Sequence, residues 1–451
     1  MKARPFLTLL LTILLGTPGV ILGLDAPDVW TAQRAITFAR QNNPDSQLAV
    51  QRMRQADALL LKSAAGFYPQ LEVFGSYSQT NNAMYSFGNI LNQGAFTPGI
   101  DFNDPGRTDN LGVGVGLTYR FYNGGQDLAN KNAARAGVDL SSAEQDAILL
   151  HLEFEVFKSF QRIIESDKVI ETRQKALEAI SSSLAVAQAR FDAGDILKAD
   201  LLNLEVQQSQ ATENLVQAQH DHELAKQIFL TLVGLPGDDL TLTAEASEIP
   251  VAPVELDAGH RPELKKLNAA LRAAESRLKA ARGSRLPTVD GFARYSHDQG
   301  TVLDGSGDSW IAGVNLNFKV FDGRQSAGEI ALAEAELGAI RAEQKKLEMA
   351  IDLEVSRARI ALDLARQRQQ VTLKMVEQAA ESESLTKARF DAGALLVSDL
   401  IDSENRLTDA RVRHVLATSA VQIAIADLRR ATGLPQYPEE IPPGNTMENQ
   451  P

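Results

Sequence analysis

The hexapeptide Ala-Arg-Phe-Asp-Ala-Gly occurs twice in the chain, as Ala189–Gly194 and again as Ala388–Gly393. Two further pairs of landmarks keep the same shift of 199 residues (388 − 189): Gly-Leu-Pro at 234–236 and 433–435, and the tripeptides that begin at Tyr122 and Phe321. Two copies with so long a period indicate a duplicated subdomain rather than an array of short repeats. Each hexapeptide predicts the turn at which one half of the chain reverses direction.

The N-terminus has the pattern of a secretory signal peptide, which we place at residues 1–23. Lys2 and Arg4 precede an apolar run over 6–15, and Pro18 and small residues follow. The alternative, a membrane anchor helix, is disfavoured because the run is shorter than about 18 residues and Pro18 interrupts it. The chain has no cysteine, which excludes disulfides and thiolate metal sites. Its net charge of −13 argues against a nucleic-acid partner, because phosphates require a basic surface.

Helical patterns of unusual length follow each strand region. One runs without proline over 126–190 and its counterpart over 325–389. Each has 65 residues and would extend for about 97 Å at roughly 1.5 Å per residue. Shorter helices are predicted at 30–42, 45–65, 195–233 and 263–283, the second and fourth with apolar residues at heptad spacing, which is typical of helices that pack along other helices. Each half therefore predicts a long helix flanked by two shorter helices in line, plus a pair of strands.

A period of two marks the predicted strands, which include 71–78, 112–121 and 310–320. Apolar residues alternate there with polar residues or glycine, and aromatic residues lie towards the ends. This is the pattern of outer-membrane β-barrel strands. A half-buried hairpin on a soluble sheet has the same alternation, but the signal peptide favours the barrel. The segments 78–110 and 296–309, rich in Asn, Gly, Asp and Ser, are predicted as exposed loops, and Phe87, Phe96 and Phe102 in the first would need packing partners.

These elements predict an α+β membrane protein with two structural repeats. We expect a first repeat at 24–236, a linker at 237–259, a second repeat at 260–435 and a disordered tail at 436–451. Four membrane strands cannot close a barrel, and open strand edges are not tolerated in lipid. The chain is therefore expected to form a homotrimer, in which twelve strands close a barrel and long antiparallel helical hairpins continue below it as a tunnel about 100 Å long.

The whole mature chain resembles the TolC-like outer-membrane efflux proteins. The resemblance rests on Asn43-Pro44, Tyr68-Pro69, the stretch 121–124, the repeated hexapeptide and the stretch 232–236. It implies a bacterial outer-membrane protein that extends into the periplasm and docks with an inner-membrane pump and a periplasmic adaptor of the membrane fusion type. Outer-membrane lipid is the remaining implied partner. The implied function is the exit duct of a tripartite efflux or type I secretion system, which conducts substrates passively.

The resemblance also implies a periplasmic aperture near the second hexapeptide. The matching positions are Phe390, Leu395, Asp399 and Asp402. Leu395 stands where the family has a basic residue, which puts an intersubunit salt-bridge latch in doubt. Asp399 and Asp402 lie three residues apart and so share one helix face. Three copies would then form acidic rings that bind cations. The alternative is that both aspartates only stabilise a helix N-terminus.

Gly194 and Gly393 are the expected adaptor-docking tips, or else only left-handed helix C-caps. The histidines at 151, 220, 222 and 414 fall on predicted helices without a metal-ligand pattern, and no metal or cofactor is expected. No phosphate loop, nucleophile elbow or zinc-binding motif is present, so the sequence does not suggest an enzyme. A periplasmic coiled-coil adaptor, or a structural protein of an envelope-spanning assembly, is the alternative function.

Overall fold

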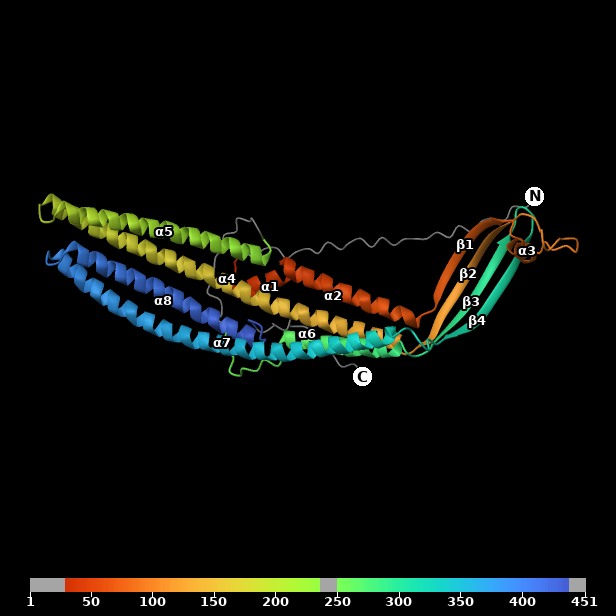
Figure 1. Ribbon diagram of the computed structural model, residues 1–451. Coiled ribbons are helices and arrows are strands. Elements are labelled where there is room, and N and C mark those ends of the chain that lie inside the picture. Colours follow the sequence, from red (N-terminus) through yellow and green to blue (C-terminus); the bar gives the residue numbers. More distant parts are fainter. Residues whose placement is uncertain (1–28, 236–249, 438–451) are drawn as a thin grey trace, which may run out of the picture.

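The computed structural model describes residues 29–235 and 250–437. Within these ranges the chain is elongated, with a sheet at one end and helices that run from it to two hairpin tips (Figure 1). The expected signal peptide at 1–23 lies outside the described residues, as do 237–249 of the expected linker and 438–451 of the expected tail. No helix in the described ranges combines the length and the apolar composition that a membrane crossing requires.

Two helices of 67 residues each dominate the molecule: α4 (Gln126–Asp192) and α7 (Gln325–Asp391). They confirm the predictions of 126–190 and 325–389 to within two residues at each end. Both helices begin in the same way. The side-chain oxygens of Asn123 and Asp322 each accept a hydrogen bond from the backbone N–H four residues on. This satisfies a donor that the first helical turn leaves unpaired.

The shorter helices lie in line along the two long ones, as the sequence predicts (Figure 1). In the first half α2 and α5 lie along α4, and in the second half α6 and α8 lie along α7. A single 3₁₀ turn over Ala64–Phe67 leads from α2 towards the sheet. The bounds of the shorter helices are α1 Ala32–Asn42, α2 Pro44–Ser63, α5 Lys198–Val233, α6 Pro262–Gly283 and α8 Val397–Ala431.

The helices form a curved layer rather than a closed bundle. Towards the tips the order across the layer is α5-α4-α8-α7, because α4 packs on both α5 and α8 and α8 packs on both α4 and α7. Towards the sheet the order is α2-α4-α6-α7. Among the described helices, α5 and α7 are therefore the edges of the layer near the tips, and α2 and α7 are its edges near the sheet.

The sheet has four antiparallel strands in sequence order: β1 (Gln70–Thr80), β2 (Thr108–Asn123), β3 (Thr288–Gln299) and β4 (Ser306–Asn317). The strand predicted at 310–320 ends early, at residue 317. The reason lies in its partner, because β3 begins directly after Pro287, which has no N–H to offer the ladder. Both edges of the sheet, β1 and β4, are unpaired within the described residues.

The two faces of the sheet differ as the alternation predicts. One row of directly opposed residues across the strands is apolar and exposed: Val73, Val115, Tyr295 and Trp310. The next row lies on the other face and consists of Phe74, Gly114, Ser296 and Ser309. Gly114 is needed there, since a Cβ on it would come within 2.5 Å of the Phe74 ring. An exposed apolar band opposite a face of polar groups and glycine, here with the Phe74 ring beside Gly114, is the arrangement of a membrane barrel strand.

The loop that joins β1 to β2 is not the exposed loop that the sequence predicted over 78–110. Strands β1 and β2 extend into it, and residues Ala83–Asn92 form a helix, α3. Its start is capped by Asn82, whose side chain accepts hydrogen bonds from the backbone of Met84 and Tyr85. The three phenylalanines of the loop pack on one another, with Phe87 edge-on to both Phe96 and Phe102. The second outer loop is also shorter than predicted, at 300–305.

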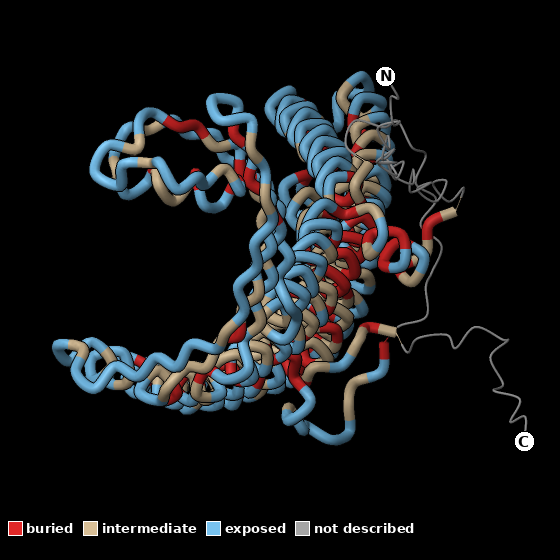
Figure 2. Tube along the Cα trace, turned by 90° about the vertical axis from the view of Figure 1, so that its right-hand side faces the viewer, coloured by how far each residue is buried: buried red, intermediate tan, exposed pale blue. Residues whose placement is uncertain are grey.

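The most buried part of the molecule lies at mid-length, where α1 covers α4. Viewed along the long axis, the buried residues gather among the helices, while most of the sheet is exposed (Figure 2). Trp30 packs edge-on against Phe38 and Phe229 in this core. Gln436, expected at the start of a disordered tail, is instead buried, and its backbone N–H donates to Glu153.

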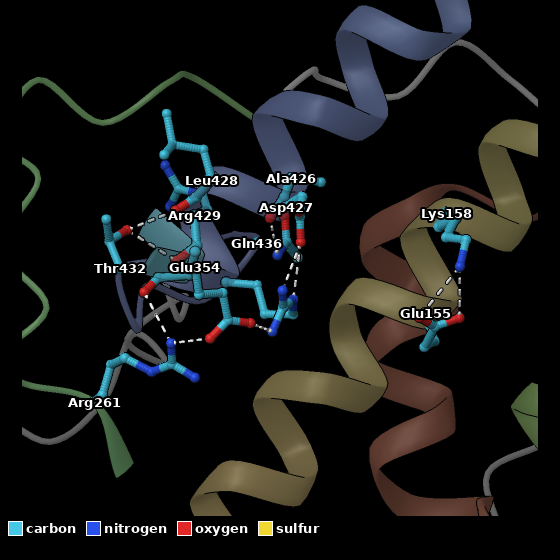
Figure 3. A network of polar contacts seen from close by, with 12 residues as sticks. Glu155, Lys158, Arg261, Glu354, Ala426, Asp427, Leu428, Arg429, Thr432 and Gln436 are labelled. Carbon is cyan, nitrogen blue, oxygen red and sulfur yellow. Dashed lines mark hydrogen bonds and ion pairs between the residues drawn. The ribbon is translucent and has the colours of Figure 1, made fainter. Parts of the chain in front are cut away.

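A charged network fixes the joint at which the second repeat begins (Figure 3). Arg261, just before α6, forms ion pairs with Glu263 and with Glu354 of α7, and it donates to the carbonyl of Ala431. Glu354 also accepts from Arg430 of α8, at 2.7 Å. The Arg261 side chain is only 5% exposed, so its pairing is required to offset the loss of water.

Candidate functional site

Each hairpin tip ends its long helix with the same backbone turn. After α4 the N–H of Gly194 donates to the carbonyl of Phe191, and the N–H of the next residue donates to Arg190. After α7 the N–H of Gly393 donates to Phe390 in the same way. Both glycines have positive φ, 84° and 75°. The expectation of left-handed C-caps is therefore confirmed, because this turn requires a residue in the left-handed region.

The start of the return helix at each tip exposes a leucine. Leu197 and Leu396 occupy the N-cap positions of α5 and α8, and they are 72% and 68% exposed. Serine, threonine, aspartate or asparagine is the usual N-cap, so leucine at both equivalent positions departs from the helix rule. The helix predicted at 195–233 begins instead at Lys198, so the sequence did not predict a leucine at its N-cap. The geometry adds an apolar contact point beside each glycine.

Phe390 lies inside the tip rather than on its surface. It is 1% exposed, in a cluster that we call the tip core: Ala187, Leu201, Leu204, Phe390, Val397 and Leu400. Arg190 of the other hairpin covers the Phe390 ring at 5.2 Å from its centroid and donates to its carbonyl. Leu395, at the position expected to be basic, packs against the same cluster. Phe390 thus joins the two hairpins, and any effect on an aperture would come through this packing.

Asp399 and Asp402 are both exposed on α8, one in its first turn and the other in the next. Neither carboxylate has a hydrogen bond or an ion pair within the described part of the chain. Asp200, the first-repeat counterpart of Asp399, differs, because its carboxylate accepts from the N–H of Leu197 at 3.4 Å and so caps α5. The second hairpin therefore presents two unpaired carboxylates where the first presents one that is used as a cap.

A polar contact crosses the seam between the two hairpins at Glu404, two residues after Asp402. Ser183 of α4 donates to Glu404 Oε1 of α8 at 2.8 Å, and both residues are buried. The other carboxylate oxygen of Glu404 is buried and has no hydrogen-bond partner among the residues that the structure describes. Burial raises the pKa of Glu404, since it disfavours the charged form, while the hydrogen bond from Ser183 acts in the opposite direction. The sequence analysis missed this site because glutamate on a long helix usually faces water.

Two of the histidines take part in helix–helix contacts. His222 of α5 lies 2.9 Å from Ser166 Oγ of α4, and His414 of α8 lies 3.3 Å from Thr372 Oγ1 of α7. His151 and His220 are exposed. In the described ranges no three histidine, aspartate or glutamate side chains gather in a way that could hold a metal ion.

Comparisons with known proteins agree with one another. The family model described as outer membrane efflux protein matches residues 35–234 and 256–434. The outer membrane efflux protein BepC of Brucella suis is 24% identical, covering 92% of this chain and 88% of BepC. The pyoverdine export outer membrane protein OpmQ of Pseudomonas putida is 25% identical, covering 88% and 84%. The crystal structure of the outer membrane protein VceC from Vibrio cholerae superposes with a TM-score of 0.78 at 18% identity, covering 90% of this chain and 97% of VceC.

Proposed function

Because the chain belongs to the outer membrane efflux protein family, we propose that it is the exit duct of a tripartite efflux or type I secretion system. Its place is the outer membrane, from which the helical part extends into the periplasm. An inner-membrane pump supplies the energy and a periplasmic adaptor connects the two, so that the duct itself conducts passively. The family match gives no support to the alternative of a periplasmic adaptor. The proposal rests on the open edges of the sheet and of the helix layer.

The sheet and the helix layer both stop at unpaired edges. β1 and β4 each leave one row of backbone donors and acceptors without strand partners in the described chain, which lipid does not tolerate. The exposed apolar row on one face shows that lipid is the medium for which these strands are built. Closure by further copies satisfies every edge, and three copies give twelve strands. An eight-stranded barrel from two copies would fill its interior with side chains.

The aperture proposal rests on the unpaired carboxylates of α8. In the trimer Asp399 and Asp402 of each copy converge at the closed end of the tunnel, so that six carboxylates surround a narrow aqueous passage. Screening is weaker in such a constriction than on an open surface. The rings attract cations to the entrance, and a multivalent cation held there blocks the passage.

Planar-bilayer recordings with the purified protein test this function. The wild-type duct conducts in steps, and divalent or trivalent cations added on the periplasmic side reduce its conductance. Replacing both aspartates by alanine (D399A with D402A) abolishes the block and weakens the cation preference, while the oligomer stays intact. The matched control is Asp200→Ala, since Asp200 is the repeat counterpart of Asp399 but serves as a cap in the first hairpin.

The result that contradicts the aperture is a double variant with wild-type block and selectivity. Asp399 and Asp402 would then be surface charges near a helix end. A wild-type protein that forms no conducting pathway at all would contradict the duct itself. The two failures are distinguishable because the first concerns selectivity and the second concerns any current.

A further inference from the structure

Three helices of the layer, α4, α8 and α7, line a groove of about 500 Å³, which we call the hairpin groove. Helix α8 forms its floor and the other two helices form its walls, since α8 packs on both of them. Its lining includes Lys158 and Arg162 of α4, Leu364 and Arg368 of α7, and Leu416 of α8. A volume of this size lies within the range of small-ligand sites, about 300 to 1,000 Å³.

The hairpin groove opens on the face of the layer that α1 does not cover. On α4, Phe160 packs in the core beneath α1. It precedes Arg162 by two residues, which turn a helix by about 200°, so the two side chains leave α4 on opposite faces. On α7, Val355 lines a second pocket together with the segment 256–259. Leu364 follows Val355 by nine residues (364 − 355), or about two and a half turns, and so again lies on the opposite face.

The same face of α8 carries one of the aperture aspartates. Asp402 precedes Ala420, which belongs to the floor of the groove, by 18 residues (420 − 402), or about five turns. In the proposed duct Asp402 borders the passage, so the hairpin groove lies in the wall of the same passage. The separation along α8 is about 27 Å at roughly 1.5 Å per residue.

The groove combines exposed apolar surface with a cation that has no partner. Leu364 and Leu416 are 54% and 42% exposed. Arg368 is also exposed, and within residues 29–235 and 250–437 its side chain forms no hydrogen bond or ion pair. Lys158 and Arg162 add positive charge on the opposite wall, although each is paired with a glutamate of its own helix. In a chain of net charge −13 this combination favours a ligand with an anionic group and an apolar body.

The two repeats differ at the positions that form the groove. Under the shift of 199 residues, three apolar residues of the second hairpin correspond to acidic or polar residues of the first, and the unpaired arginine corresponds to an apolar one. The pairs are Leu364 and Glu165, Leu416 and Gln217, Ala420 and Asp221, and Arg368 and Val169. The first repeat therefore places carboxylates, which repel an anion, where the second places apolar surface. The anion-binding character belongs to the second hairpin.

We propose that the hairpin groove binds a small amphipathic anion, an aromatic sulfonate or carboxylate, as it passes through the duct. The guanidinium of Arg368 pairs with the anionic group, for which its planar fork of donors is suited. The apolar body of the ligand covers Leu364 and Leu416 and removes them from water. The aperture aspartates do not oppose this binding, because about 27 Å exceeds the screening length of about 8 Å at physiological salt. The site rests on the proposed function, which places this face of the helices in a passage.

A single cysteine in the groove measures its occupancy, since the chain contains none of its own. Ala361 is exposed in the α7 wall. We expect naphthalenesulfonate to slow the alkylation of Ala361→Cys by iodoacetamide in the detergent-extracted protein. Inorganic sulfate lacks the apolar body and naphthylmethylammonium has the opposite charge, so neither should slow it. The control is Gln370→Cys, which lies exposed nine residues further on, on the opposite face of α7, and should not be protected.

Substitutions in the Ala361→Cys background identify the groups that bind. Arg368→Gln should raise the naphthalenesulfonate concentration that halves the alkylation rate by roughly fivefold, as expected for a partly exposed ion pair. Leu416→Gln, which introduces the residue of the first repeat, should also weaken protection, and it covers the case in which the first substitution disturbs folding. The matched control is Arg366→Gln, because Arg366 is exposed two residues before Arg368 on the opposite face of α7.

Conductance of the same samples is recorded in planar bilayers. Protection that weakens with Arg368→Gln and Leu416→Gln, but not with Arg366→Gln, supports the site. A conducting protein with no protection, with equal protection by sulfate, or with unchanged protection in both groove variants overturns the site and leaves the duct in place. A wild-type protein that gives no current overturns the duct, and with it a site for a passing anion.

Discussion

At the scale of single residues, Glu404 is a buried titratable group near the hairpin tips. It is 5% exposed at the contact of α4 with α8. The hydroxyl of Ser183 faces it from α4, while Lys387 and Glu383 act on it from α7. Nearby, α5 meets α8 through the neutral hydrogen bond between Gln207 and Asn405. Burial dominates this balance and raises the pKa of the carboxyl above its ordinary 4.5.

A pH-dependent stability follows from this shift. Because the pKa of Glu404 is higher in the packed seam than in the unfolded chain, its contribution is fully present below the ordinary pKa and is lost as pH rises through the raised pKa. Each unit of the shift corresponds to about 1.4 kcal/mol. We expect Glu404→Gln, which stays neutral, to gain thermal stability over the wild type as pH rises from 5 to 8. All samples are compared as dissociated monomers, in which Glu205→Gln, at the exposed repeat counterpart of Glu404 (404 − 199 = 205), should give no such trend. Parallel melting curves of Glu404→Gln and the wild type across this range would contradict the assignment.

The sequence suggests some residues of the candidate site but not others. Asp399 and Asp402 are aperture candidates only through the family resemblance, which places an aperture just after the second hexapeptide, and their role stays a prediction. Glu404 could not be found in this way, because its burial depends on which face of α8 meets α4. Heptad spacing predicts that helices pack, but it does not say which helix covers which face.

At the scale of elements, the long helices were the easiest to predict and the outer loop the hardest. Uninterrupted helical periodicity over 65 residues leaves few alternatives, and the structure agrees to within two residues at each end. Helix α3 was missed because asparagine and glycine over 81–110 are typical of loops, although Asn82 before an apolar run is also a helix start signal. The alternation of apolar and polar residues predicts the strands, but it does not by itself say which strands pair with one another.

We propose that a periplasmic adaptor docks at the hairpin tips, around Gly194 and Gly393. The exposed leucines beside them, Leu197 and Leu396, would be covered by the adaptor, since an apolar side chain at an N-cap gives the helix no hydrogen bond. We expect L197D with L396D to abolish the export phenotype when it complements a deletion strain, while bilayer conductance of the purified variant stays at the wild-type level. Leu48→Asp, an exposed leucine of α2 far from the tips, is the control. Full export by the double variant would exclude docking through these leucines.

At the scale of the whole molecule, one chain is a segment of a larger closed structure. Its sheet ends at β1 and β4, its helix layer ends at α5 and α7 near the tips, and both kinds of edge lie on the same two sides of the molecule. The apolar row of the sheet from Val73 to Trp310 remains exposed in a single copy, and so do Leu353, Ile360 and Val371 of α7. The duplication explains this arrangement, because each repeat supplies two strands and one hairpin to a ring that needs several such units.

The number of chains in the ring is the central claim and is open to direct measurement. Native mass spectrometry of the wild-type protein, extracted from outer membranes in detergent, should give one species at three times the mass of the mature chain. Twelve strands and twelve helical rods then close without a free edge. A stable species at one or two chain masses, active in planar bilayers, would contradict the account.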